Sequence, residues 1–369
     1  MSIGIIGAGQ LGRMMALAGY PLGMRFTFLD KTSDTPGAQV GDIVLGDFTR
    51  SDDIRRLAEQ VDLLTYDVEN VPVEALKSAA GDTPIHPSPA LLGIAQDRLT
   101  EKQAFAEHGM ATAPYRTVDS LVDLRAAIDE LGMPAVLKRR QLGYDGRGQR
   151  FIRQAGDIES AWEALSGAPL ILEGFVDFDR EVSLIAVRNR SGEMAFYPLS
   201  DNRHEEGILR LSIAPCADRT LQTQAESQIR SLMDAFDYAG VLTVEYFEKG
   251  GELIANEMAP RVHNSGHWTI EGAATSQFEN HLRGILDLPL GDTSPRGHVA
   301  MINCLGQMPA LADCIRYPDV HYHDYGKAPR PRRKLGHITA VRPDRASLDS
   351  VVDELLAVVR AAEATSAEC

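Results

Sequence analysis

The chain has 369 residues, with 37 lysines and arginines against 52 aspartates and glutamates, so its formal net charge at pH 7 is −15. Hydrophobic residues make up 44% and charged residues 24%, which excludes a disordered chain, a collagen and a coiled coil. The acidic excess argues against a nonspecific nucleic-acid binder. No run of about 18 apolar residues is present, so we expect no membrane span. No basic segment precedes the apolar run at 3–6, and the four cysteines are widely spaced, so we expect a cytoplasmic protein without disulfides.

The first 95 residues alternate short apolar runs with helical patterns. The apolar runs predict strands at 3–6, 25–29, 43–45 and 62–65, and the helical patterns lie at 10–20 and 52–59. This alternation predicts a parallel sheet with crossover helices, that is, a Rossmann-like domain over residues 1–95. The proline-rich segment 83–89 is typical of a domain exit.

From residue 96 the pattern changes to strands in succession. We expect helices at 97–108, 120–131, 157–165 and 220–236, and strands at 135–138, 170–172, 182–187, 209–213, 240–248 and 252–258. Strands in runs predict an antiparallel α+β domain over residues 96–295. Residues 296–369 are interrupted by prolines and predict a small C-terminal domain that ends in a helix near 348–362.

A glycine motif follows the first predicted strand. Residues 7–12 read Gly-Ala-Gly-Gln-Leu-Gly, and Asp30 ends the next predicted strand. Such a loop can bring backbone N–H groups to a phosphate, and an acidic residue at this distance holds the ribose in dinucleotide-binding domains. The segment alone therefore predicts either a nicotinamide-dependent dehydrogenase or a tight turn without a ligand.

A second glycine-rich loop follows the predicted strand that ends at Lys138. Gly143, Gly146 and Gly148 lie within six positions, which is typical of a mobile flap whose amides close over phosphates. A lysine at the end of a strand can meet the same phosphates as a point charge. The spacing differs from that of a P-loop, so the loop, which we place at 139–150, indicates another nucleotide-binding architecture, or else a hairpin turn with a solvated lysine.

Two carboxylates lie on the facing strands of a predicted hairpin, where antiparallel pairing puts Glu245 roughly opposite Asn256 and Glu257. Glu245 and Glu257 lie in the apolar strands on either side of Lys249-Gly250-Gly251, which reads as the turn. Like charges on facing strands repel one another unless a cation joins them. A few carboxylates together with substrate phosphates are the ligands that suit Mg²⁺. The alternative is that both acids lie on a solvated face.

Six segments taken together resemble the ATP-grasp superfamily, and within it the N5-carboxyaminoimidazole ribonucleotide synthase family. They are residues 7–14, 67–72, 97–102, 143–149, 256–267 and 333–337. The resemblance covers essentially the whole chain. It implies an ATP-grasp fold of mixed α/β and α+β class, with a Rossmann-like N-terminal domain and a small C-terminal domain.

The resemblance also implies the nucleotide site. The residues that would contact ATP phosphates or cover them are Arg98, Lys138, Gly143, Tyr144, Asp145, Gly146, Arg147, Gly148 and Gln149. Those on the adenine and ribose side would be Glu173, Phe175, Val176, Glu181 and His204. Glu245 and Glu257, with Asn256 adjacent, would hold one or two Mg²⁺ ions. We therefore expect ATP and Mg²⁺ as cofactors, and neither biotin nor nicotinamide.

Members of this family carboxylate 5-aminoimidazole ribonucleotide with ATP and bicarbonate in purine biosynthesis. The resemblance implies that Arg261, His263, Asn264 and Ser265 line the bicarbonate and carboxyphosphate pocket, and that Asp145 lies at the reacting centre, where it either orients the reacting amine or accepts a proton from it. The ribonucleotide would be bound by Gln10, Glu69, Tyr144, Arg147, Lys327, Arg333 and Lys334. Arg332 departs from the glycine that members often have there, which leaves open which of Arg330, Arg332, Arg333 and Lys334 meets the 5′-phosphate. The family resemblance also implies a homodimer.

Three alternatives remain. The formate-using glycinamide ribonucleotide transformylase is a similar enzyme with a cationic amine substrate and acids at two contact positions, where this chain has the neutral Gln10 and Asn264. A neutral pair fits the weakly basic amine of an aminoimidazole better. A nicotinamide dehydrogenase would leave the hairpin carboxylates and the second glycine loop unexplained. A nucleotide-binding regulator without activity would have no need of Lys138, Glu245 and Glu257.

Overall fold

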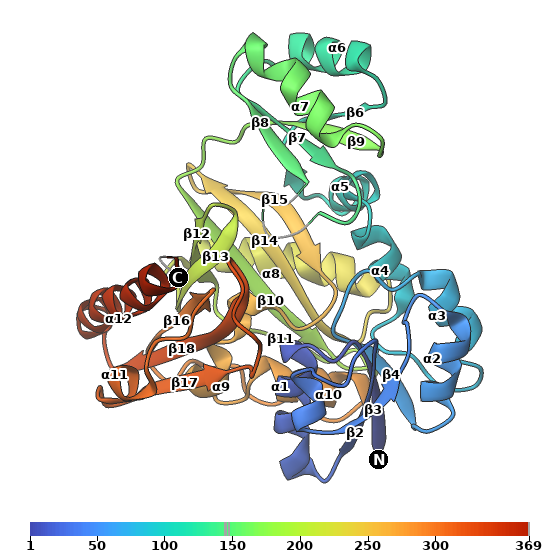
Figure 1. Cartoon of the computed structure of the whole chain (residues 1–369), viewed down its shortest axis with the longest axis vertical. Coiled ribbons are helices and arrows are strands. Elements are labelled where there is room, and N and C mark those ends of the chain that lie inside the picture. The colour runs from blue at the N-terminus through green and yellow to red at the C-terminus, as the bar shows by residue number, and fades with distance from the viewer. Residues whose placement is uncertain (144–145, 147, 368–369) are drawn as a thin grey trace.

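The computed structural model describes residues 1–143, 146 and 148–367 (Figure 1). Three sheets organise this part of the chain: one of four strands near the N-terminus, another of four strands in the upper part of Figure 1, and a central sheet of ten. Tyr144, Asp145 and Arg147 of the predicted flap lie outside the described residues.

The N-terminal unit is the predicted parallel sheet. Its strands, in the order β3-β2-β1-β4, are β1 (Ser2–Ile6), β2 (Arg25–Asp30), β3 (Asp42–Leu45) and β4 (Leu63–Tyr66). Its helices are α1 (Gln10–Gly19), α2 (Ser51–Ala58), α3 (Val73–Ala79) and α4 (Pro89–Ala95), with short 3₁₀ turns at Tyr20–Leu22 and Gly37–Gln39. The run Ile3, Ile5 and Ile6 is fully buried, as expected for a parallel strand covered on both faces.

The upper unit has its own sheet and core. Its strands, in the order β6-β9-β7-β8, are β6 (Tyr115–Val118), β7 (Ala135–Arg139), β8 (Gln149–Ile152) and β9 (Leu170–Gly174), all antiparallel. Helices α6 (Leu121–Leu131) and α7 (Ile158–Leu165), the latter preceded by a 3₁₀ turn at Ala155–Asp157, pack on it through a cluster that includes Leu124, Ile128 and Leu165 (Figure 1). Helix α5 (Arg98–Glu107) leads from α4 into this unit.

The central sheet has the order β17-β18-β16-β13-β12-β10-β14-β15-β5, with β11 beside β10. Its strands are β5 (Ala111–Thr112), β10 (Arg180–Arg188), β11 (Met194–Phe196), β12 (Ser200–Glu205), β13 (Ile208–Ala214), β14 (Gly240–Lys249), β15 (Glu252–Ala259), β16 (His298–Leu305), β17 (Val320–Asp324) and β18 (Lys334–Arg342). Its helices are α8 (Arg219–Ala235), a 3₁₀ turn at Asn264–Gly266, α9 (Thr269–Gly272), α10 (Gln277–Ile285), α11 (Leu311–Ile315) and α12 (Arg345–Ala367).

The C-terminal strands belong to this same central sheet. Strand β16 pairs antiparallel with β13, and β18 pairs with both β16 and β17. The predicted boundary at residue 295 therefore falls between two parts of one hydrogen-bonded sheet. The N-terminal unit is also joined to it, because a cluster that includes Met15 of α1 and Phe278 and Leu282 of α10 runs between the two. The boundaries at 95 and 295 stay predictions.

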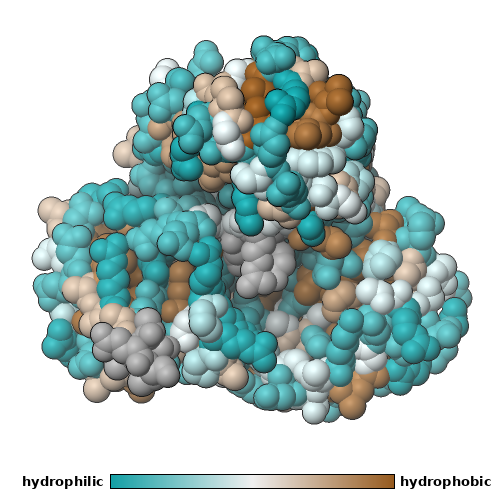
Figure 2. All heavy atoms as spheres, turned by 45° about the horizontal axis from the view of Figure 1, so that its top comes forward, coloured by the Kyte–Doolittle hydropathy of each residue, from teal (hydrophilic) through white to brown (hydrophobic). Residues whose placement is uncertain are grey.

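Most of the surface visible in Figure 2 is hydrophilic, and apolar atoms gather there only in small patches, one of them on the upper unit. No helix in the described part of the chain is long and apolar enough to cross a membrane.

The glycine loop after β1 is closed around carboxylates of the chain itself. Asp67, which follows β4, accepts hydrogen bonds at one oxygen from the amides of Gly9 (2.7 Å) and Gly12 (3.1 Å). Asp30 accepts from the amide of Ala8 (3.1 Å). These three amides are the donors that a dinucleotide pyrophosphate would need. An internal carboxylate therefore takes the place of the phosphate that the nicotinamide alternative requires.

This loop generates a stability prediction. Gly7 has a φ of +92°, and a Cβ there would overlap Asp67 Oδ1. We expect Gly7→Ala to destabilise the protein by about 3 kcal/mol or more, because left-handed strain adds to displacement of the buried Asp67 carboxylate. Gly23→Ala is the matched control: its φ is +75° and nothing lies within 4 Å of the added Cβ. It should cost only about 1–2 kcal/mol. Urea unfolding measures both, and equal costs would contradict the packing of Asp67 against Gly7.

Candidate active site

The two predicted carboxylates meet across the β14–β15 hairpin. Glu245 lies directly opposite Glu257, next to a bulge, and the turn between the strands is formed by Gly250 and Gly251, both with positive φ. The Glu245 side chain is 13% exposed, whereas that of Glu257 is 42% exposed. The hairpin thus places one carboxylate inside the protein and leaves the other partly exposed, so the solvated-face alternative does not describe Glu245.

Burial and like charge dominate the electrostatics of Glu245. Burial, together with the charges of Glu257 and Glu181, raises its pKa to about 7, although the charge of His204 acts in the opposite direction. His204 Nε2 lies 4.0 Å and His263 Nδ1 3.8 Å from the Glu245 carboxylate. Glu245 thus lies where a positive charge would favour its ionised form.

His204 is held as a cation beside this pair. Its Nδ1 lies 2.8 Å from Glu181 Oε2. Burial alone would lower the pKa of His204, but the hydrogen bond to Glu181 and the charge of Glu245 raise it to about 9. Two predicted nucleotide contacts, Glu181 and His204, are therefore joined to the predicted metal ligand Glu245.

The residues present fit a magnesium ion bound with a nucleotide. No three His, Cys, Asp or Glu side chains in the described part of the chain are grouped as a metal cage. Mg²⁺ usually takes only one or two protein carboxylates and completes its shell with waters and phosphate oxygens. A facing pair, one member of which is buried with a raised pKa, has that donor set. Asn256, adjacent to Glu257, has a buried side-chain oxygen with no hydrogen-bond donor in the structure.

Lys138 lies at the end of β7, as predicted, and its Nζ is 2.9 Å from Glu173 Oε2. The same oxygen is 3.3 Å from Nζ of Lys102 on α5, which is 1% exposed. Burial would raise the pKa of Glu173, but Lys138, Lys102 and Arg98 together lower it to about 2. The carboxylate therefore stays ionised and fixes both lysines.

Arg98 connects this group to the hairpin. Its guanidinium lies 3.4 Å from Glu257 Oε2, and its backbone N–H donates to Arg140 O. The preceding Asp97 caps α5 and binds Arg140 through two hydrogen bonds, of 2.9 and 2.7 Å. The upper unit, which carries Lys138 on β7, is thus anchored to helix α5, which carries Arg98. The positions of these two cationic side chains relative to each other are therefore fixed, with Arg98 beside Glu257.

The predicted adenine side follows strand β9. Glu173 and Gly174 end that strand, and the backbone N–H of Phe175 donates to Pro134 O at 3.2 Å. Phe175 is 44% exposed and Val176 is partly exposed. Of the predicted flap residues, Gly143, Gly146 and Gly148 lie between β7 and β8 of the same small sheet, and Gln149 begins β8.

The segment after β15 brings together the four residues predicted for the bicarbonate pocket. Arg261 forms an ion pair with Glu69 of the N-terminal unit at 2.8 Å. His263 Nδ1 lies 2.9 Å from Ser265 Oγ, which also accepts a hydrogen bond from Ser183 at 2.8 Å. Burial lowers the pKa of His263 well below its usual value, so its imidazole is neutral.

The predicted ribonucleotide contacts are gathered from the two ends of the chain. The Lys327 ammonium donates to Gln10 Oε1, although 317 positions separate them. Arg332, the departure noted above, forms an ion pair with Glu206 on the β12–β13 turn, and Arg333 donates to Ala328 O at 3.0 Å. Lys334 begins β18. The Arg332 guanidinium is thus engaged with an acid of the chain.

Sequence reasoning missed two residues that shape the site. Lys102 falls in a segment that carried the resemblance, but no role was assigned to it. Glu101 accepts a hydrogen bond from the Met258 backbone at 2.7 Å and so fixes β15 beside Glu257. Burial raises the pKa of Glu101 to about 8. The available signal was a pair of charged residues, Glu101 and Lys102, on the buried face of a predicted helix.

Three protein-family models match successive parts of the chain. They are the ribonucleotide synthetase preATP-grasp domain (residues 1–96), the ATP-grasp domain (103–278) and the phosphoribosylaminoimidazole carboxylase C-terminal domain (299–351).

Similar proteins match nearly the whole chain. The N5-carboxyaminoimidazole ribonucleotide synthase of Pseudomonas aeruginosa is 49% identical, over 98% of this chain and all of its own. The crystal structure of the synthetase from Thermus thermophilus is 52% identical with a TM-score of 0.92, covering 96% of this chain and 98% of its own. An Aspergillus clavatus synthase structure, in complex with ADP and 5-aminoimidazole ribonucleotide, is 31% identical with a TM-score of 0.90, covering 97% and 98%.

The lysine–carboxylate group generates a pH prediction. The pKa of Glu173 is lowered in the folded chain from 4.5 to about 2, so its stabilising effect is complete above pH 4.5 and is lost as the pH falls towards 2. Glu173→Gln should therefore cost roughly 3 kcal/mol near neutral pH, and less as the solution is acidified. Unfolding at several pH values measures this.

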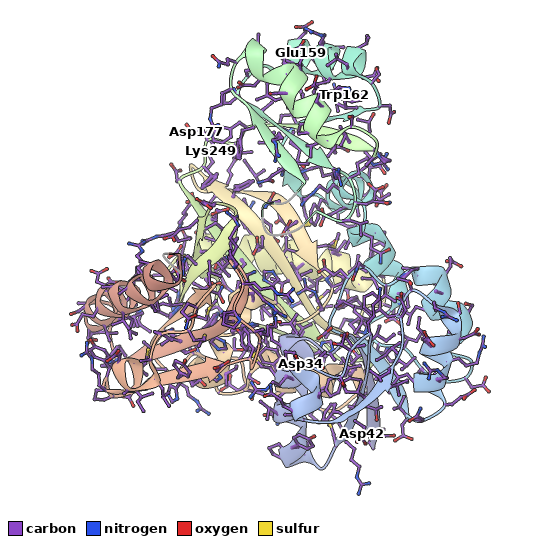
Figure 3. The ribbon with its side chains drawn as sticks, viewed as in Figure 1. Asp34, Asp42, Glu159, Trp162, Asp177 and Lys249 are labelled. Atoms are coloured by element: carbon purple, nitrogen blue, oxygen red, sulfur yellow. The ribbon has the colours of Figure 1, made fainter. Side chains whose placement is uncertain are left out.

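The control is Glu159→Gln on α7 in the upper unit (Figure 3), which removes an exposed ion pair with Arg125 on α6. It should change stability by less than about 1 kcal/mol. A Glu173→Gln cost that did not vary with pH would contradict the proposed charge state of Glu173.

Proposed function

Because the chain belongs to the N5-carboxyaminoimidazole ribonucleotide synthase family of ATP-dependent ligases, we propose that it uses ATP and bicarbonate to carboxylate the exocyclic amine of 5-aminoimidazole ribonucleotide. The products would be N5-carboxyaminoimidazole ribonucleotide, ADP and phosphate, formed in purine biosynthesis. The single observation that carries the proposal is the facing pair Glu245 and Glu257, with Arg98 beside it. The Lys138–Glu173 ion pair lies in the upper unit, which is anchored to the helix that carries Arg98. We also propose a cytoplasmic homodimer, on the family resemblance alone.

The chemistry requires an activated carboxyl group, because bicarbonate is a poor electrophile. Transfer of the terminal phosphoryl group of ATP to a bicarbonate oxygen gives carboxyphosphate and ADP, and carboxyphosphate then delivers CO₂ to the waiting amine and releases phosphate. Mg²⁺ held by Glu245 and Glu257 would neutralise charge on the transferred group. Arg98 and Lys138 supply fixed positive charge to the same phosphates.

The pocket after β15 supplies the bicarbonate contacts. Arg261 is already fixed by Glu69, so its guanidinium needs little reorganisation to hold an anion. His263 is neutral and engaged with Ser265, so it positions the loop and adds no charge. The flap at 139–150 would exclude water from carboxyphosphate, with Asp145 orienting the amine.

The ribonucleotide would bind between the N-terminal unit and the C-terminal strands. Gln10 and Lys327 meet there across the two parts of the chain, and Arg333 and Lys334 lie close by in sequence. Because Arg332 pairs with Glu206, we assign the 5′-phosphate to Lys327, Arg333 and Lys334. Tyr144 and Arg147, from the flap, and Glu69, through Arg261, would complete the contacts.

The second candidate is formate-dependent transformylation of glycinamide ribonucleotide. That amine is a cation before reaction and would favour acids around it. The two positions in question are Gln10, whose oxygen is bound by Lys327, and the buried amide Asn264. A neutral pair favours the carboxylation.

The first experiment is phosphate release from Mg-ATP. The purified protein should show strong stimulation only when bicarbonate and 5-aminoimidazole ribonucleotide are both present. Glycinamide ribonucleotide with formate is the parallel arm. Stimulation by that pair instead would replace the proposed substrate while keeping the ATP site.

The hairpin acids give a sharper test. Glu257→Ala should reduce stimulated phosphate release by at least about a hundredfold, because a phosphoryl-transfer site that loses a metal ligand loses charge stabilisation. The matched control is Glu252→Ala on the same strand, where the side chain is exposed near the turn. It should leave the rate unchanged. If Glu257→Ala kept more than about a tenth of the activity, Glu257 would not be a metal ligand.

A further inference from the structure

Asn264 is paired with a residue that the sequence did not single out. Its Nδ2 donates to Oδ1 of Asn303 at 3.1 Å, and Asn303 Nδ2 donates back to Asn264 Oδ1 at 2.7 Å. Asn303 lies on β16 and is completely buried, and Asn264 begins the 3₁₀ turn after β15. The two amides form a closed, reciprocal pair between β16 and the segment that also carries Arg261 and Ser265.

A backbone carbonyl decides which way this pair is oriented. Asn303 Nδ2 also donates to Leu209 O on β13 at 2.8 Å. A carbonyl oxygen only accepts hydrogen bonds, so the group of Asn303 that faces it must be the NH₂ group. The orientation of Asn264 follows, with its oxygen towards the Asn303 NH₂ group and its NH₂ group towards the Asn303 oxygen.

The backbone of Asn303 is fixed as well. Its carbonyl oxygen accepts a hydrogen bond from Arg210 at 2.9 Å, and the Arg210 guanidinium is bound by Glu363 of α12 at 2.7 and 3.0 Å. Asn303 therefore cannot turn over without losing Leu209 O and cannot move away without disturbing Arg210. The pair has one stable arrangement.

This arrangement does not accept an acid at position 264. A carboxylate there would place an oxygen 3.1 Å from Asn303 Oδ1, where two acceptors face each other without a proton. We propose that Asn303 is a positioning and specificity-determining residue: it keeps position 264 neutral and oriented, so that the pocket accepts an uncharged amine and not an alkylammonium group. The inference rests on the proposed function, whose amine is weakly basic.

The experiment is a double-mutant cycle of Asn264→Asp and Asn303→Leu in the full-length protein. Asn264→Asp should lower kcat/KM for 5-aminoimidazole ribonucleotide by about tenfold or more, while KM for ATP changes less than about twofold. In the Asn303→Leu background, Asn264→Asp should lower kcat/KM for 5-aminoimidazole ribonucleotide by a clearly smaller factor, because the opposing Asn303 oxygen is absent. Equal costs in the two backgrounds would overturn the proposal.

A second readout needs no substrate. The carboxyl group that Asn264→Asp introduces would face Asn303 Oδ1 and be stabilised when protonated, so its pKa should be raised in the folded chain. The loss of Tm caused by Asn264→Asp should then be larger at pH 8 than at pH 5, because the stability is lost as the pH rises through the raised pKa. A loss of Tm independent of pH would contradict the proposal even if Asn303→Leu failed to fold.

The matched control is Asn189→Asp. Asn189 is also buried, and its Nδ2 donates to Glu193 at 3.0 Å and to Leu288 O at 3.3 Å. Asn189→Asp should lower Tm but leave KM for ATP and KM for 5-aminoimidazole ribonucleotide unchanged. A loss of stability alone is thereby distinguished from a loss of substrate positioning. If wild-type phosphate release does not respond to 5-aminoimidazole ribonucleotide, the proposed function fails, while the pH dependence of Tm still tests the pairing of Asn264 with Asn303.

Discussion

The constraint on which the site depends is the pairing of two carboxylates across the β14–β15 hairpin. Glu245 and Glu257 are in direct register, and Glu245 is buried, so the fold must surround them with positive charge or leave one protonated. Arg98 approaches Glu257 from α5, and His204 approaches Glu245 from β12. These residues come from separate parts of the central sheet and the helix that leads to the upper unit.

The same principle recurs throughout the molecule. Two other buried acids are matched by donors from distant segments: Glu173 by Lys102 and Lys138, and Asp67 by the amides of Gly9 and Gly12. These pairs leave few buried charges uncompensated, because an unpaired buried charge is costly. The Glu173 carboxylate also holds Lys102 and Lys138 in place, so that little reorganisation of Lys138 would accompany binding of the proposed nucleotide phosphates.

The glycine loop after β1 shows that the same local sequence motif can bind different groups. The motif, its strand and its helix all form as the spacing predicts. What differs is the group that the amides bind, which here is Asp67 from the end of β4. A phosphate and a carboxylate satisfy the same N–H donors, so the motif by itself does not distinguish them. In this chain the loop fixes α1, and so carries Gln10 towards Lys327.

What the sequence by itself determined are the features that arise from neighbouring residues. Apolar runs placed the parallel strands of the N-terminal unit, and the turn at Gly250 and Gly251 put Glu245 roughly opposite Asn256 and Glu257, because hairpin register follows from the turn. The bulge next to Glu245, which the sequence did not predict, then sets Glu245 opposite Glu257. Only the tertiary structure decided which distant groups meet: Lys102 with Glu173, Asn303 with Asn264, and β16 with β13 in one sheet. Hydrophobic periodicity predicts which face of a helix or strand is buried. It does not predict which distant residue that face contacts, because the contact depends on how the whole fold packs.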